Sequence, residues 1–213
     1  MLKIYGTDPS SPVNAVRMCA NALGLEYEYI QVNMSEGEHK SEKYLALNPV
    51  GKVPAIDDDG FTVFESAAIM KYLCRKNGAN YYPQDLLKQA IVDQWLSFVC
   101  VHIYMALARV LFNKVIGPQI GASVDERSLK TGYEFLARFL PVIEGQLKKT
   151  KYLAGDELSI ADFALLANVD PAEVVELDLT PYPKLSAWRE NLQAQNFYQK
   201  VHKFYGESLM PEK

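Results

Sequence analysis

Two serines at the start of a predicted helix are the first residues whose position could do chemistry. Ser10 and Ser11 stand directly before Pro12, and proline is typical of the first turn of a helix. The unpaired N–H groups of a helix N-terminus carry partial positive charge, so an anion beside these hydroxyls is stabilised. The pair is therefore either an ordinary helix cap or the binding site of a negatively charged group.

Two further segments could bind parts of a small molecule. A cis peptide bond between Val53 and Pro54 would leave the backbone N–H and C=O of Val53 free to pair with an extended peptide. Glu65 and Ser66 precede another predicted helix. Ser66 and the free N–H groups of that helix could bind a carboxylate, and Glu65 an ammonium group. The alternative interpretation of Glu65 and Ser66 is a simple helix cap.

Three cationic candidates complete the set, namely His39, Lys40 and Lys52. They could face a second carboxylate, although lysines in a polar loop are usually only solvated. Together the segments offer an anion-stabilising hydroxyl, a backbone edge for a peptide, an amino-acid head-group site and a distant cationic site. Glutathione has a thiol, a peptide bond, a γ-glutamyl zwitterion and a glycyl carboxylate in that arrangement.

The elements that must position these residues alternate between strands and helices before residue 80. Period-two and short apolar runs predict strands, Pro12 and Ser66 begin helical patterns, and Asp57–Gly60 is typical of a hairpin turn. This order suits a small mixed sheet with helices on its faces. The predicted strands cover 2–5, 26–32, 53–56 and 61–64, and the helices 12–23 and 66–76.

After residue 85 the patterns are helical, so we predict an α+β chain whose second domain is all helix. Ser159 and Asp162 have the spacing of a capping box at the start of a buried helix. The predicted domains are 1–78 and 86–213, with a linker at 79–85. Helical patterns cover about 86–115, 125–148, 159–168, 183–194 and 196–205.

The composition excludes several classes of protein. Apolar types make up 49% of the 213 residues and charged types 23%, as in ordinary globular proteins. A net charge of −4 argues against nucleic-acid binding. The most apolar stretch, 95–108, is too short for a bilayer and is predicted to be a buried helix. Three cysteines without a CxxC pair and an N-terminus without a signal pattern favour a cytoplasmic protein without a bound metal.

Four segments, by their residues and by their order and spacing, resemble the soluble glutathione transferases over essentially the whole chain. The resemblance is closest to the serine-type phi and theta classes. They read KIYG, GEHKSEKYLALNPVGKVPAI, FESAAIMKYL and KYLAGDELSIADF. The resemblance implies a thioredoxin-like N-terminal domain, an all-helical C-terminal domain and a homodimer. It also implies a cis-proline at Pro54, and glutathione as a co-substrate with no other cofactor.

The resemblance also implies roles for the residues above. Ser10 matches the catalytic serine, with Ser11 as a rival; the spacing after Gly6 favours Ser10. Asn14 stands where many relatives carry arginine, and Lys52 where phi-like members often have glutamine. By the same resemblance, the glycine end of glutathione matches His39, Lys40 and Lys52, its cysteinyl backbone matches Val53, and its γ-glutamyl group matches Glu65 and Ser66.

A second substrate, a small hydrophobic electrophile, is expected between the two domains, because such junctions commonly form apolar clefts. The same fold could instead serve a glutathione-binding or ligand-carrying protein without chemistry, or a glutathione-dependent peroxidase. The candidate walls of the electrophile pocket are Pro9, Pro12, Met105, Arg109 and Phe112.

Overall fold

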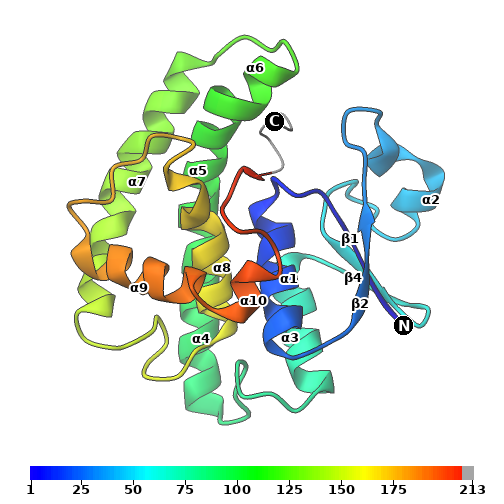
Figure 1. Ribbon diagram of the computed structural model, residues 1–213, viewed down its shortest axis with the longest axis horizontal. Helices are drawn as coiled ribbons and strands as arrows, with labels where there is room; N and C mark the ends of the chain where they lie inside the picture. The colour runs from blue at the N-terminus through cyan, green and yellow to red at the C-terminus, as the bar shows by residue number, and fades with distance from the viewer. Residues whose placement is uncertain (208–213) are drawn as a thin grey trace.

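The computed structural model describes residues 1–207 and shows a four-stranded mixed sheet beside a group of helices (Figure 1). The strands lie in the order β2-β1-β3-β4. The central strand β1 is parallel to β2 and antiparallel to β3, which pairs antiparallel with β4. The strands are β1 (Leu2–Gly6), β2 (Tyr27–Gln31), β3 (Ala55–Asp58) and β4 (Phe61–Phe64).

The predicted hairpin between β3 and β4 is confirmed. Asp59 and Gly60 both have positive φ angles, 53° and 92°, as turns of this kind require. The N–H of Gly60 also donates to Asp57 Oδ1 at 2.7 Å. The turn aligns Asp58 with Phe61 and Ala55 with Phe64. This register fixes the end of β4 and therefore the position of Glu65, the next residue.

Two predictions in the first half differ from the structure by more than one residue. Strand β3 begins at Ala55 rather than at residue 53, because Pro54 has no N–H for the ladder and follows a cis peptide bond. The polar segment 33–43, for which no helix was predicted, leads through a 3-10 turn at Glu38–Lys40 into α2 (Glu42–Leu45). Ser41 starts α2 by accepting a hydrogen bond from the N–H of Tyr44 at 3.2 Å.

Two helices of the first half lie between the sheet and the remaining helices (Figure 1). They are α1 (Ser11–Ala22) and α3 (Ser66–Lys76). Their apolar side chains share one buried core with the strands and with the second half. Because burial of apolar surface is the main stabilising contribution to folding, this shared core holds the two halves together.

The second half is helical, as predicted, although its first helix runs further than residue 115. It continues from Leu86 to Gln119 and includes two π-helical turns, η2 (Val99–Ile103) and η3 (Phe112–Ile116). The helices are α4 (Leu86–Phe98), α5 (Tyr104–Leu111), α6 (Gly117–Gln119), α7 (Glu126–Leu147), α8 (Ile160–Val169), α9 (Pro183–Gln193) and α10 (Asn196–Gln199).

By length and composition the segment Leu86–Gln119 could cross a membrane, and 44% of its most apolar window is buried inside the protein. Trp95, Val99, Ile103 and Leu107 from this segment belong to the shared core. This packing is that of a core helix.

Helix α5 crosses α7 closely at Gly132. A Cβ atom there would lie 2.7 Å from Val110 Cγ2 and 2.9 Å from the carbonyl oxygen of Ala106. Only glycine therefore lets the two helices approach to this distance. The contact sets the position of α5 on the side away from the first half.

The last helix is shorter than the predicted 196–205. Helix α10 ends at Gln199, and the chain then turns back along α1. The carbonyl of Val201 accepts from Arg17 Nη2 at 3.5 Å, and the Tyr205 hydroxyl donates to the carbonyl of Pro9 at 2.8 Å. These tertiary hydrogen bonds replace the helical ones. Residues 208–213 of the predicted helical domain lie outside the described residues.

The predicted capping box at the start of α8 is confirmed. Asp162 is fully buried, and its carboxylate accepts from the N–H of Ser159 at 3.0 Å, from the Ser159 hydroxyl at 2.8 Å and from the N–H of Leu153 at 2.9 Å. Burial raises the pKa of this carboxyl to about 6, while the hydrogen bonds oppose the rise. The box thus keeps a buried carboxylate satisfied at the core.

Replacing Ser159 with alanine should lower the free energy of unfolding by about 0.5–2 kcal/mol, because it removes the cap and one donor to Asp162. Urea unfolding of Ser159→Ala and wild type measures the difference. Ser97 is exposed on α4, so Ser97→Ala is the control and should change stability little. Equal stability of Ser159→Ala and wild type would contradict the structural role of the box.

Candidate active site

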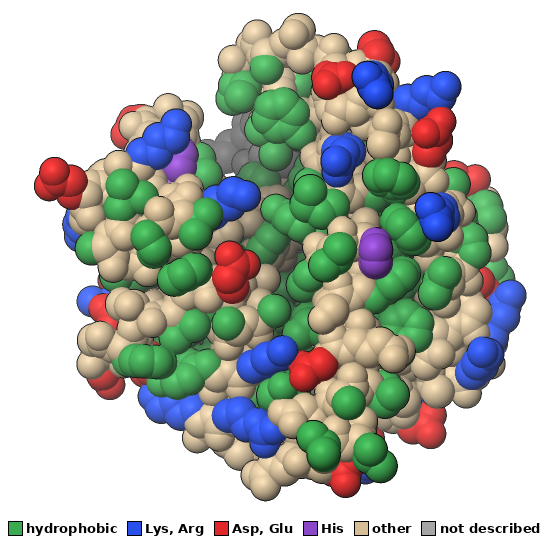
Figure 2. Space-filling model, turned by 180° about the vertical axis from the view of Figure 1, so that it is seen from behind, with side chains coloured by type: hydrophobic (Ala, Val, Ile, Leu, Met, Phe, Trp, Pro, Cys, Tyr) green, Lys and Arg blue, Asp and Glu red, His purple; other side chains and the backbone are tan. Residues whose placement is uncertain are grey.

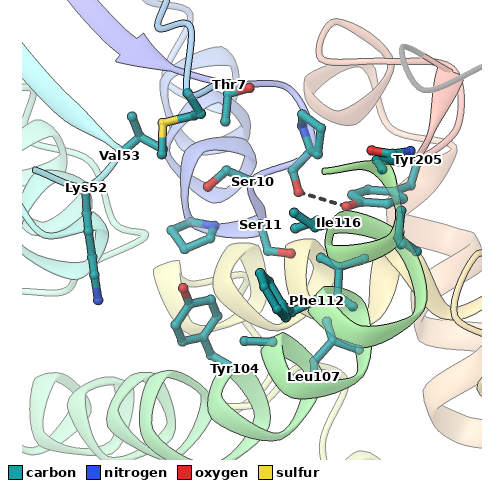
Figure 3. Close-up of a pocket in the computed structure, with 17 residues that line it drawn as sticks. Thr7, Ser10, Ser11, Lys52, Val53, Tyr104, Leu107, Phe112, Ile116 and Tyr205 are labelled. Atoms are coloured by element: carbon teal, nitrogen blue, oxygen red, sulfur yellow. Dashed lines mark hydrogen bonds between the residues drawn. The ribbon is translucent and has the colours of Figure 1, made fainter. Parts of the chain in front are cut away.

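Two connected hollows lie at the junction of the two halves. The first, here the Ser10 cavity, has a volume of about 410 Å³ and lies between the turn after β1 and helix 104–119 (Figure 3). The second, here the Glu65 crevice, has a volume of about 280 Å³. Figure 2 shows the surface hollowed between the two halves. Four residues line both hollows, namely Pro12, Lys52, Val53 and Tyr104.

Ser10 is the N-cap of α1, but its side chain makes no capping hydrogen bond within residues 1–207. It lines the Ser10 cavity, and its hydroxyl points to the side of Val53 in Figure 3. Helix α1 has no acidic residue in its first turn that would neutralise its positive end. A hydroxyl that is not used for capping and a helix N-terminus therefore face the same space.

Ser11 is the first residue of α1 and is 4% exposed. It lines the same cavity, and its hydroxyl points toward Phe112 in Figure 3. Only Ser10 is directed toward the part of the site that joins the Glu65 crevice. This geometry favours Ser10 over Ser11 for an anion held between the two hollows.

Val53 offers its backbone to the site. The Val53–Pro54 bond is cis, as the resemblance implied. The N–H and C=O of Val53 have no hydrogen-bond partner in the described chain, while the carbonyl before them, that of Lys52, accepts from Tyr44 Oη at 2.8 Å and from Asn48 Nδ2 at 2.5 Å. The loop is thus held from behind, and the peptide groups of Val53 remain free for an extended ligand.

Glu65 and Ser66 lie at the start of α3. Glu65 is the N-cap, with φ 69° and ψ 113°, and its side chain makes no capping bond within the described part of the chain. A positive φ is costly for a non-glycine residue, and such residues cluster at functional sites. Ser66 is the first helical residue, so its N–H lacks a partner in the helix. A carboxylate thus lies beside a helix N-terminus, as a ligand with both an ammonium and a carboxylate group requires.

The charge of Glu65 acts on its neighbours in the crevice. Burial, and secondarily the charge of Glu65, raises the pKa of Cys100 and of Tyr104. Both side chains therefore stay protonated near neutral pH. The negative potential that opposes their ionisation would stabilise an ammonium group in the same place.

The three cationic candidates are not equivalent. Lys52 is exposed and lines both hollows. His39 and Lys40 lie on the 3-10 turn and line neither hollow. The carbonyl of His39 would lie 3.1 Å from a Cβ at Gly51, so the backbone of this turn packs against the loop that carries Lys52. Of the three, the structure brings only Lys52 to the site.

The expected wall of the electrophile pocket was partly wrong. Pro9, Pro12 and Phe112 line the Ser10 cavity, but Met105 lines the Glu65 crevice instead. Arg109 lines neither hollow and donates from Nη1 to the carbonyl of Met105 at 2.7 Å. The residues of this helix that line the Ser10 cavity, Tyr104, Ala108 and Leu111 among them, precede the expected ones by about one position.

Several lining residues were missed by the sequence reasoning. Tyr104, Leu107 and Leu111 belong to the same helix as the expected residues and differ from them only in rotational phase, which helical periodicity alone does not determine. Tyr205 lies 196 residues from its hydrogen-bond partner, and no local pattern marks it. The other missed residues are Thr7, Met34, Ala108, Val115, Ile116 and Gln119.

Comparisons with known proteins identify the family and the fold. The family model "Glutathione S-transferase, N-terminal domain" matches residues 1–75, and "Glutathione S-transferase, C-terminal domain" matches residues 94–196. The chain is 38% identical over 209 residues to a probable glutathione S-transferase of Oryza sativa, which covers 94% of this chain and 95% of the relative. It is 35% identical over 206 residues to glutathione S-transferase 1 of Manduca sexta, covering 94% and 91%.

Solved structures with the same fold include glutathione S-transferase-I bound with lactoylglutathione, with a TM-score of 0.86 and 34% identity over 94% of this chain and 97% of that one. Glutathione transferase F7 from Populus trichocarpa has a TM-score of 0.85 and 31% identity over the same shares. The matched domains and the fold define a class of glutathione-dependent transferases. The chain belongs to the glutathione S-transferase family and is a transferase.

Proposed function

We propose that the protein joins glutathione, through its thiolate sulfur, to small hydrophobic electrophiles and that Ser10 stabilises this thiolate. The observation that carries the proposal is the Ser10 side chain, which lines the cavity without a capping bond at the N-terminus of α1. In this binding mode the γ-glutamyl group meets Glu65 and Ser66, the cysteinyl backbone meets Val53, and the glycyl carboxylate lies toward Lys52. The sulfur then lies near Ser10, where the two hollows meet.

The chemistry needs an ionised sulfur. A free thiol has a pKa of about 8.5 and is mostly protonated at neutral pH. The Ser10 hydroxyl does not remove this proton, which leaves to solvent; it donates a hydrogen bond to the resulting thiolate, assisted by the N-terminus of α1. The thiolate electron pair then forms a C–S bond to the electrophilic carbon, and the bond to the leaving group breaks with its electrons.

The second substrate is proposed to bind in the Ser10 cavity. Most of the side chains that line its outer part are apolar, including Leu107, Leu111, Phe112 and Ile116. Among the residues of the range 1–207 that line it, Lys52 is the one with an ionic side chain. Such a cavity favours uncharged, apolar molecules, because burying a charge without a partner is costly.

Two further properties complete the proposal. We expect a homodimer, because Leu87 and Ile91 on one face of α4 are 76% and 41% exposed and Phe61 is 56% exposed, and exposed apolar surface marks interaction sites. We also expect a cytoplasmic enzyme, since Cys19 and Cys74 are buried free thiols with sulfurs 3.9 Å apart, as in a reducing compartment.

One pair of assays tests the function. We expect the protein to conjugate glutathione to a halogenated nitroarene, measured by absorbance, and to be retained on immobilised glutathione. Retention without conjugation would contradict the catalytic role and favour a carrier. Conjugation that persists when the glutathione is replaced by a simple thiol of equal pKa would contradict specific binding at Glu65 and Val53.

A further inference from the structure

The turn that carries Ser10 is held by a residue from the far end of the chain. The Tyr205 hydroxyl donates to the carbonyl of Pro9 at 2.8 Å, across 196 positions of sequence (Figure 3). This carbonyl belongs to the peptide unit that joins Pro9 to Ser10. The N–H of the same unit donates to the carbonyl of Thr7 at 3.0 Å. Both polar atoms of the peptide unit before Ser10 therefore have partners.

Helix α1 holds the same turn from the other side. Asn14 Nδ2 donates to the carbonyl of Asp8 at 2.8 Å, and Arg17 Nη1 contacts the Asp8 carboxylate at 3.0 Å. A second-half side chain also bonds to this turn: in the described chain, that bond is the one from Tyr205. The turn is thus clamped between α1 and the C-terminal segment, and its position depends on both.

Tyr205 is itself held in place. Its side chain belongs to the shared core and is 6% exposed. Three residues before it, His202 Nε2 lies 2.8 Å from Asp170 Oδ2, and the Tyr198 hydroxyl donates to Asp170 Oδ1 at 2.7 Å. Asp170 is 1% exposed at the end of α8. Burial, with a smaller contribution from the charge of Asp170, also raises the pKa of Tyr205, so its hydroxyl keeps the proton it donates.

We propose that Tyr205 is a positioning residue for catalysis: its hydrogen bond to Pro9 fixes the peptide unit that places the Ser10 side chain. This inference rests on the proposed role of Ser10. The orientation of that unit determines where the hydroxyl of Ser10 points. The strength of a hydrogen bond depends steeply on its distance and angle, so a small rotation of the unit weakens the bond to sulfur without removing any group that binds glutathione.

The test is Tyr205→Phe, which keeps the ring in the cavity wall and removes only the hydroxyl. We expect kcat with saturating glutathione to fall by about three- to tenfold, the range set by the loss of one neutral hydrogen bond. The KM for glutathione should change by less than about twofold, because the groups proposed to bind glutathione in both the ground state and the transition state are all retained. Ultraviolet titration should show the pKa of the bound thiol moving upward.

A matched control is Tyr133→Phe, because the Tyr133 hydroxyl also donates to a backbone carbonyl, that of Val175, at 2.6 Å but outside the site. This variant should keep the wild-type kcat and thiol pKa. Hydrogen exchange of the peptide covering 7–12 gives a readout independent of activity, and Tyr205→Phe should speed its exchange while Tyr133→Phe does not.

Two results would overturn the inference. One is a folded Tyr205→Phe protein, by near-ultraviolet circular dichroism, with wild-type kcat and thiol pKa. The other is unchanged exchange of residues 7–12 in Tyr205→Phe. If wild type itself conjugates nothing, the proposed function fails, and the exchange measurement alone then decides whether Tyr205 holds the turn.

Discussion

Replacing Ser10 with alanine should slow turnover by about 10- to 150-fold, the largest effect we expect at the site. A hydrogen bond to a charged group contributes about 1.5–3 kcal/mol, and each 1.36 kcal/mol is a factor of ten in rate. The KM for glutathione should change little, because the γ-glutamyl and backbone contacts remain. The pKa of the bound thiol should return toward about 8.5, its value in free solution, as measured by ultraviolet absorbance of the thiolate.

Ser11→Ala is the matched control for this experiment. Ser11 is adjacent, shares the cavity and is directed toward Phe112, so its loss should affect the thiol pKa little. If Ser11→Ala lost activity while Ser10→Ala retained it, the assignment of the two serines would be reversed. A thiol pKa that is equally high in free glutathione and in the wild-type complex would remove the role of any serine.

The second large effect is expected from Glu65→Gln, which keeps the shape of the side chain and removes its charge. We expect the KM for glutathione to rise by about tenfold, because a charge-assisted hydrogen bond to the ammonium group becomes a neutral one. Turnover at saturation should remain close to that of wild type, since Glu65 binds a part of the substrate that does not react. Initial rates at varied glutathione concentration measure both quantities.

N-acetylglutathione, which lacks the ammonium charge, identifies the group that Glu65 binds. Wild type should bind this analogue more weakly than glutathione, whereas Glu65→Gln should discriminate little between the two. If both proteins showed the same preference for glutathione, Glu65 would not contact the ammonium group. An unchanged melting temperature excludes a general effect of the substitution at this positive-φ position.

Much of the first half follows from local sequence signals. Strand β4 has the predicted bounds, the Asp57–Gly60 turn is present, and the capping box at Ser159 starts α8. These features depend on a few neighbouring residues, whose turn geometry and capping bonds form within one segment. Ser10 and Glu65 could be singled out for the same reason, because each stands directly before a helix, and Val53 because it precedes the proline directly before strand β3.

The arrangement between distant segments could not be read in this way. Helical periodicity left the rotational phase of α5 open, and Arg109 lies on a face of the helix that lines neither hollow. His39 and Lys40 were chosen for their charge, but they lie on the 3-10 turn and line neither hollow. Tyr205 had no signal at all, because its partner at Pro9 is close only after α10 and the following turn have folded back along α1. Contacts of this kind depend on the packing of the whole core, which no single segment encodes.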